Sequence, residues 1–469
     1  MWFCWPRLRP FLRICLDWHS GHSIFFPFDL LCPNLSFIPQ ICNAQFFFQR
    51  TDFRNKVSDI RDAIGGAFPN LTIESNLPLV QQSGIEQRKI GTRFQINTPI
   101  TNSANLLWGF DFTNEKNDTE ESVIDTVAFD EEREVNIVDT VTRVPKFEID
   151  NLGLFLEGNW DVSQKLILTG GLRYENIDID VEDWTGSAIA NFLDVAAGRP
   201  LPEFQGGQVN ESDVAFNFGI LYKLSSTISL YSNFSQSFTI PSLRQAGTTA
   251  SEDINIFTID EFLAPEKVDN YEIGVRGNWS SVQFTAPVYY NNTDKGQNFT
   301  INTNELLFID IVRTPQRNYG VEATLDLQPV NTWSLGGTFT WMEGEGDLFA
   351  DDNRSWVPLS SVDVQPMKLT FYLENQTLPS WNNRLQLLYV TNRDRAFDEG
   401  TDAFRITGYT TVDFVSSLNT GFGKWQVGIE NLLNHQYIPV TNQAAIGAGD
   451  TERFAAPGRT LSIRYFLNF

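Results

Sequence analysis

Apolar and polar residues alternate along many segments of the chain from about residue 46 onward. The last nine residues show this clearly, because the odd positions carry the main apolar set: Leu461, Ile463, Tyr465, Leu467 and Phe469. Residues 319–328 and 368–374 alternate in the same way. A period of two places each set on one face of a β-strand. The pattern predicts an all-β protein, and by itself it fits both a soluble sandwich and a barrel.

Counting backward from residue 469, the alternation predicts sixteen strands. They are 45–55, 88–98, 104–114, 150–160, 165–180, 214–224, 227–238, 268–279, 281–291, 306–328, 332–344, 366–378, 381–395, 405–419, 422–432 and 459–469. One local conflict stands in this assignment. Pro287 interrupts an alternating segment and removes a backbone donor, which a central strand tolerates poorly.

The connections between these strands are of two kinds. Short turns are expected near 98–104, 161–164, 224–227, 279–281, 328–332, 378–382 and 420–423, and long polar connections at 176–213, 239–267 and 345–364. Short turns at one end and long loops at the other are typical of outer-membrane barrels.

Tryptophan placement and the polar face also favour a barrel. Five tryptophans lie beside short turns and are expected to form an aromatic girdle: Trp160, Trp279, Trp333, Trp381 and Trp425. The polar face carries charged residues that a sandwich interior would not accept: Arg93, Arg173, Arg276, Lys368, Glu374 and Arg384. A wide lumen accepts them. We therefore expect a large antiparallel transmembrane β-barrel over residues 46–469.

Charge and hydropathy support this reading. The chain holds 58 acidic and 34 basic residues, a net charge of -24, which argues against nucleic acid as a partner. The sequence contains no run of 18 or more apolar residues, so no membrane-spanning helix is predicted. A closed barrel is the other structure that can cross a bilayer.

The first 45 residues differ from the rest. All four cysteines lie among them, together with many Trp, Phe and Pro residues and no steady period. They make a poor signal peptide, and zinc is not expected because no C-x-x-C pair is present. We expect residues 1–45 to be an atypical segment, disordered or a misassigned start, outside the barrel fold.

Several motifs resemble TonB-dependent outer-membrane receptors, particularly ferric-siderophore receptors of the cyanobacterial kind. They are Tyr231-Ser-Asn-Phe-Ser-Gln-Ser-Phe238, Leu263-Ala-Pro-Glu-Lys-Val-Asp-Asn-Tyr-Glu-Ile-Gly-Val275, Tyr319-Gly-Val-Glu322, Ile429-Glu-Asn-Leu-Leu-Asn-His-Gln-Tyr437, Pro457-Gly-Arg-Thr460 and the terminal Phe469. Their order over most of the chain makes the resemblance specific.

The resemblance implies a barrel of about 22 strands whose lumen is filled by an N-terminal plug. It also implies a ferric siderophore as ligand at the extracellular mouth, the outer membrane as location and lipid as surroundings, and Phe469 as a signal for the barrel-assembly machinery. The TonB complex would be a partner only if a plug and a TonB box lie upstream, and neither is recognisable in this sequence. We therefore expect a truncated receptor with sixteen of the 22 strands.

Such a wall has two possible forms. The strand near 45–55 could close against 459–469 under strain, or the barrel could stay incompletely closed, with residues 1–45 straying into the lumen as a false plug. An open edge in lipid leaves backbone groups without partners.

The resemblance also suggests ligand-binding candidates on or beside the long loops. They are Tyr174, Tyr231, Phe234, Phe238 and Arg244. Aromatic and arginine groups suit a planar, anionic ferric complex. The alternative is that these residues belong to the aromatic girdle and to loop packing.

Other candidate chemistry is weak. Residues 111–139 hold eleven acidic residues against two basic ones, which fits calcium binding or, more simply, a solvated loop. Residues 343–353 lack the spacing of a calcium loop. His435 is the only histidine after residue 22, and no Ser-His-Asp arrangement can be assembled around it. We expect no enzyme activity, no cofactor and no metal site.

The leading function is uptake of a ferric siderophore, powered through TonB. A passive porin-like channel is the alternative, and liposome conductance would separate the two. An outer-membrane enzyme is disfavoured by the near absence of histidine.

Overall fold

The fold is one large antiparallel sheet. The computed structural model describes residues 2–4, 15–17, 21–31, 41–55, 57–59, 80–185, 200, 203–240, 243, 265–302, 308–347, 355–445 and 455–467. These residues form a sheet of 21 strands and a separate two-stranded hairpin, β10 (Trp184–Thr185) with β11 (Glu203–Phe204). Among the helices of the described residues, none has the length and apolarity needed to span a membrane.

Seventeen strands of the sheet are eight residues or longer. They are β3 (Gly21–Leu31), β4 (Ile41–Arg54), β6 (Val80–Thr101), β7 (Ala104–Ile124), β8 (Ile137–Asp161), β9 (Leu166–Val181), β12 (Gly207–Lys223), β13 (Ile228–Thr239), β14 (Glu266–Asn278), β15 (Val282–Asn302), β16 (Phe308–Val330), β17 (Trp333–Asp347), β19 (Lys368–Leu378), β20 (Trp381–Val390), β21 (Tyr409–Thr420), β22 (Gly423–Glu430) and β23 (Thr460–Leu467). The short members are β1 (Trp2–Cys4), β2 (Cys15–Asp17), β5 (Ser58–Asp59) and β18 (Trp356–Pro358).

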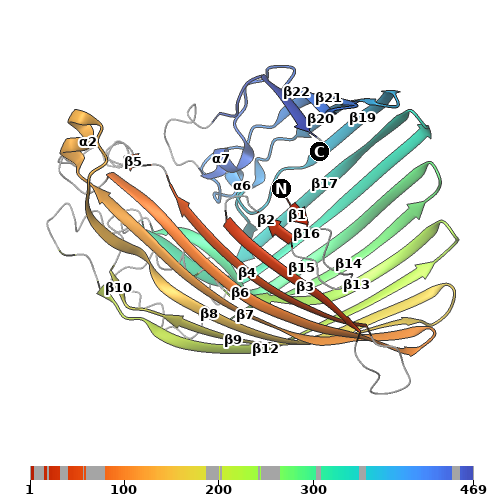
Figure 1. Ribbon diagram of the computed structural model, residues 1–469, viewed down its shortest axis with the longest axis horizontal. Coiled ribbons are helices and arrows are strands. Elements are labelled where there is room, and N and C mark those ends of the chain that lie inside the picture. The colour runs from red at the N-terminus through yellow and green to blue at the C-terminus, as the bar shows by residue number, and fades with distance from the viewer. Residues whose placement is uncertain are drawn as a thin grey trace.

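The long strands pair in the order of the chain, each antiparallel to the next. This meander curves into the wall shown in Figure 1. All sixteen predicted strands are present as β4, β6 to β9, β12 to β17 and β19 to β23, and all seven predicted short turns join them. In Figure 1 the turns that follow β6 and β8 lie at the right, and the longer connections with α2 (Thr126–Glu132) and β10 lie at the left.

The N-terminal segment differs from the expectation. β3 pairs with β4 over its whole length, from Gly21 opposite Thr51 to Leu31 opposite Ile41. β2 then pairs with β3, and β1 with β2. The described part of residues 1–45 therefore extends the wall by hydrogen bonding to it, where we expected a segment outside the fold or a false plug.

The wall is not closed. Within the described ranges, β23 pairs with β22 alone, and no pairing joins it to β1, β3 or β4. Of the two predicted forms, the incomplete wall is confirmed.

The two faces of the wall have opposite character. One face carries large apolar side chains that remain exposed, for example Leu154 at 47%, Ile273 at 62% and Phe371 at 47%. Exposure of so many apolar groups on one continuous face is the reverse of a soluble protein. The other face is polar, so the strands build an apolar face and a polar face from a period of two.

Pro287 lies within β15, opposite Gly274 of β14. On its other side, the pairing with β16 is interrupted between Thr285 and Val288. Proline has no N–H to donate, so the conflict seen in the sequence is resolved by a local gap in the ladder.

Candidate functional site

The polar face of β6 to β9 carries a network of charged side chains. The Arg173 guanidinium donates to both carboxylate oxygens of Asp111, with Nη1–Oδ2 at 3.0 Å and Nη2–Oδ1 at 2.8 Å. Arg173 also donates to Glu175, and Arg93 Nη2 lies 3.4 Å from Asp111 Oδ2. Paired contacts of this kind are the strongest ion pairs available to side chains.

Gly153 gives this network its space. It lies on β8 directly between Asp111 and Glu175 in the register. A Cβ at this position would lie 2.1 Å from Arg173 Nη2 and 2.9 Å from Asp111 Oδ1. The guanidinium therefore crosses an entire strand at a position that has no side chain.

Guanidinium groups also lie over tyrosine rings on the polar face. Arg276 lies 5.6 Å from the ring centroid of Tyr231, and Arg384 lies 4.3 Å from that of Tyr372. The Tyr372 hydroxyl donates to Asp326 Oδ1 at 2.5 Å. This face presents cations, carboxylates and aromatic hydroxyls together, a combination suited to a polar or charged solute.

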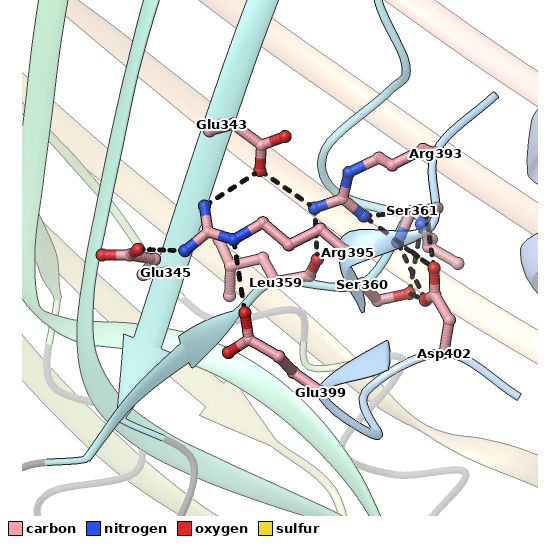
Figure 2. Close-up of polar contacts among 10 residues, drawn as sticks. Glu343, Glu345, Leu359, Ser360, Ser361, Arg393, Arg395, Glu399 and Asp402 are labelled. Atoms are coloured by element: carbon pink, nitrogen blue, oxygen red, sulfur yellow. Dashed lines mark hydrogen bonds and ion pairs between the residues drawn. The ribbon is translucent and has the colours of Figure 1, made fainter. Parts of the chain in front are cut away.

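A second network lies at the long-connection end (Figure 2). Arg393, with a side chain only 4% exposed, donates from Nη1 to Ser361 Oγ at 2.8 Å and from Nη2 to Leu359 O at 3.0 Å. Its Nη2 also lies 3.3 Å from Glu343 Oε2. Asp402, equally buried, accepts from Ser360 Oγ at 2.9 Å and Ser361 N at 3.0 Å. We call these residues the loop network, since they join the connections 348–367 and 391–408.

Arg395 extends the loop network to the end of β17. It lies in the short helix α6 (Arg395–Asp398) and contacts Glu345 at 2.5 Å and Glu343 at 3.4 Å. Glu345 also forms an ion pair with Arg317, whose guanidinium lies 4.2 Å from the centroid of the Trp356 ring. The hydrogen bond to Glu345 raises the pKa of Arg395 further above its ordinary value, so this cation stays charged.

A third connection packs onto the same region. Gln443, in α7 (Val440–Ala445), accepts from Thr407 N at 2.8 Å and donates to Thr407 O at 2.9 Å. Val390, Ile406 and Val440 are almost fully buried together. The connection after β22 is thus fixed to the connection after β20.

The connection between β9 and β12 forms its own apolar cluster at this end. Trp184 and Phe204, from β10 and β11, stack with centroids 4.9 Å apart. They pack with Ile177, Ile179 and Val181, which share the polar-face parity of Arg173 on β9. This connection thus packs over the end of the polar face of β9.

The predicted ligand residues are not brought together. Tyr174 continues the apolar parity of Leu172, and Phe234 contacts Tyr271 on the apolar face at 5.1 Å. Tyr231 lies on the polar face, and Phe238 packs against the cluster of Trp184 and Phe204. Arg244 lies outside the described residues.

The five tryptophans lie at the short-turn ends of their strands with 38–52% of each residue exposed: Trp160, Trp279, Trp333, Trp381 and Trp425. Their placement suits the predicted girdle. Phe469 lies outside the described residues.

Two other candidates have structural partners. Glu343 and Glu345, at the weak calcium-like segment, contact arginines of the loop network. The backbone N–H of His435 donates to Asn431 Oδ1 at 2.9 Å, and its ring meets Tyr437 edge-on. Across the described ranges, no group of three His, Cys, Asp or Glu residues could hold a metal ion.

Sequence reasoning missed the loop network. Its signals were the Arg393-Asp394-Arg395 cluster and Asp402, in a connection with no period. Such contacts are made by individual side chains across non-periodic segments, so alternation does not reveal them.

Comparison with known proteins identifies a family, relatives and solved structures that this chain resembles. The sequence model described as "TonB dependent receptor-like, beta-barrel" matches residues 34–432. The ferric aerobactin receptor of Klebsiella pneumoniae is 25% identical over 424 residues, covering 86% of this chain and 56% of that receptor. The rhizobactin receptor of Rhizobium meliloti (strain 1021) is 23% identical, covering 79% of this chain and 50% of that protein. Among solved structures, the copper transporter OprC shares the fold with a TM-score of 0.75 at 15% identity, covering 97% of this chain and 66% of that one.

Proposed function

Because the chain belongs to the family of TonB-dependent receptor-like β-barrels, we propose that it takes part in uptake of a ferric siderophore across the outer membrane. Its sheet is an outer-membrane wall, with the apolar face toward lipid and the polar face toward the lumen. The chain spans about half the length of the curated relatives it matches, 56% for the ferric aerobactin receptor.

The observation that carries the proposal is the mouth of the lumen. Connections from β17, β20 and β22 pack together at the end with the long connections, where Arg393 and Gln443 hold them in fixed positions. A preorganised set of loops above a polar lumen suits capture of a bulky polar complex. One relative is named a ferric aerobactin receptor and another a rhizobactin receptor, and these names support a ferric siderophore as the ligand here.

Energy for uptake would come from the TonB complex, as the family name implies. Such coupling needs a plug and a TonB-contacting segment in the mature protein. The lumenal arginine–carboxylate network around Asp111 offers polar partners to a plug surface.

Transport of iron-55 by cells tests the proposal. Iron-starved cells without their own siderophore receptors would express the natural gene product and receive ferric aerobactin or ferric rhizobactin. We expect uptake that disappears in a strain lacking TonB. Uptake equal to that of cells with an empty vector, for both complexes and with the protein in the outer membrane, would contradict the proposal.

The passive porin is not favoured, because the matched family consists of receptors. Planar-bilayer conductance of the purified protein separates the two classes. A steady open pore would favour the porin.

A further inference from the structure

The lipid face changes character along β4, β6 and β7 in a regular order. Nearest mid-membrane, Phe46, Thr92 and Phe112 lie opposite one another on the three strands. The next residues outward on this face are Phe48, Ile90 and Asn114. Ile90 is 54% exposed and marks the outer limit of the apolar band here.

One step further outward lies a row of three cations. Arg50 lies directly opposite Arg88, and Arg88 directly opposite Lys116. Each step of two residues along a strand is about 7 Å. The row therefore lies immediately beyond the apolar band, at the height of lipid headgroups. Its side chains are 44%, 55% and 59% exposed, so they are accessible from the membrane surface.

Like charges directly opposite one another on neighbouring strands are destabilising. Two carboxylates offset the repulsion among the three cations only in part. Glu86 lies 3.0 Å from Arg50 and 2.7 Å from Arg88, and Glu148 lies 2.8 Å from Lys116. Three cations share two carboxylates, and exposed pairs of this kind contribute little and exchange partners readily.

A pocket of about 390 Å³ adjoins the row and is lined mostly by charged residues of β6 to β9 and by the residue that follows β9. Its lining is Glu86, Arg88, Lys116, Asn117, Asp118, Lys146, Phe147, Glu148, Asp180 and Glu182. Lys146 pairs with Asp118 at 2.6 Å. The pocket opens beside the cation row, on strands whose other face lines the lumen.

We propose that Arg50, Arg88 and Lys116 bind the phosphate of a lipid headgroup in the outer leaflet. Arginine matches phosphate with two parallel donors, and lysine adds a point charge. The acyl chains of such a lipid lie against Phe48 and Ile90, one step toward mid-membrane.

The surrounding carboxylates favour a lipid over a free anion. Asp52, Glu86 and Asp118 form the next row outward, so a free phosphate approaching from water first meets negative charge. A lipid headgroup approaches from the membrane side, where the cations come first. Acyl-chain contacts add affinity that a free phosphate lacks.

Binding of bisphosphoryl lipid A to the purified full chain in detergent, followed by native mass spectrometry, tests the site. The variant R50Q/R88Q/K116Q should bind about a hundredfold more weakly, given roughly a fivefold loss for each of the three cations at a charged membrane surface. Lys89→Gln is the matched control, because Lys89 follows Arg88 but lies on the lumenal face, paired with Glu115 at 3.0 Å. Circular dichroism and heat-modifiable gel mobility confirm that each variant is folded.

Four results would overturn the proposal. The first is equal lipid A binding by the folded triple variant. The second is equal binding of dephosphorylated lipid A by the unchanged protein. The third is displacement of lipid A by 10 mM inorganic phosphate (a concentration on the order of weak anion affinities), which would leave a simple anion site. If Arg88→Glu alone, in a folded protein, also leaves binding unchanged, the row has no role.

Discussion

At the scale of single residues, Arg393 is the most constrained group of the loop network. Its guanidinium is almost completely buried, and it makes contacts with Ser361, Leu359 and Glu343. A buried charge is tolerated only when several polar partners surround it. Arg393 is therefore the residue whose loss should release the loops without affecting the wall.

Arg393→Met is expected to loosen the connections 355–367 and 391–408, because Glu343 and Asp402 lose their buried cation. Breaking such a contact costs about 3 kcal/mol or more. Hydrogen exchange of these two segments should rise while that of β17 and β20 stays unchanged. Arg405→Met is the control, since Arg405 is 61% exposed and pairs with Asp398 at the surface. Equal protection in both variants would contradict the role of Arg393.

The raised pKa of Arg395 predicts how the loop network responds to alkali. A basic group whose pKa is higher in the folded protein than in the unfolded chain stabilises the fold. This stabilisation is fully present below the pKa of the unfolded chain, and it is lost only as the pH rises through the pKa of the folded protein. That unfolded value already lies far above neutral pH. The carbon-13 chemical shift of Arg395 Cζ in NMR should therefore stay that of a charged guanidinium from neutral pH to about pH 10. A change of this shift toward that of the neutral form near pH 9, with the fold intact, would contradict the charged contact with Glu345.

At the scale of elements, alternation located sixteen strands because each shows one face to lipid and the other to the lumen. It missed β3, whose sequence Gly21–Leu31 holds Pro27 and four phenylalanine or isoleucine residues without a clean period. The position of β3 in the sheet is set by its pairing with β4. Parity in β9 also put Tyr174 with Leu172, so the apolar position of this candidate was predictable.

Gly153→Ala should disturb the contact between β7 and β9, because the new methyl group overlaps the Arg173 guanidinium. Overpacking of this kind costs about 1–3 kcal/mol. Gly158→Ala is a matched control on the same strand, since its nearest atoms lie 3.9 Å from the added Cβ. Urea unfolding in lipid vesicles measures the difference. Equal midpoints for the two variants would refute the close approach at Gly153.

At the scale of the whole molecule, the structure is a wall with two chemically different faces, and among the described residues β23 pairs with β22 alone. The strand order could be predicted, because consecutive alternating segments joined by short turns must pair. Closure could not be predicted, because a strand edge has the same alternation whether or not a partner lies beside it. The loop network escaped prediction since its contacts follow no period.

The two faces predict opposite responses to one substitution. Ile273→Arg places a charge on the lipid face and should cost about 2–4 kcal/mol of stability in a bilayer. Thr324→Arg places the same charge on the lumenal face and should change stability little. Folding yield and urea midpoints in vesicles check both variants. A tolerated Ile273→Arg would mean that this face does not meet lipid.

Gly153 has a further consequence for how the wall keeps its alignment. Sliding one strand by two residues past its neighbour preserves which side chains face lipid, so alternation cannot detect that error. The guanidinium of Arg173 can reach Asp111 only where the intervening strand presents hydrogen instead of carbon. A shift by two would place Asn151 or Phe155 in that gap and break the contact. This glycine therefore distinguishes the observed register of β7, β8 and β9 from the registers that are shifted by two residues.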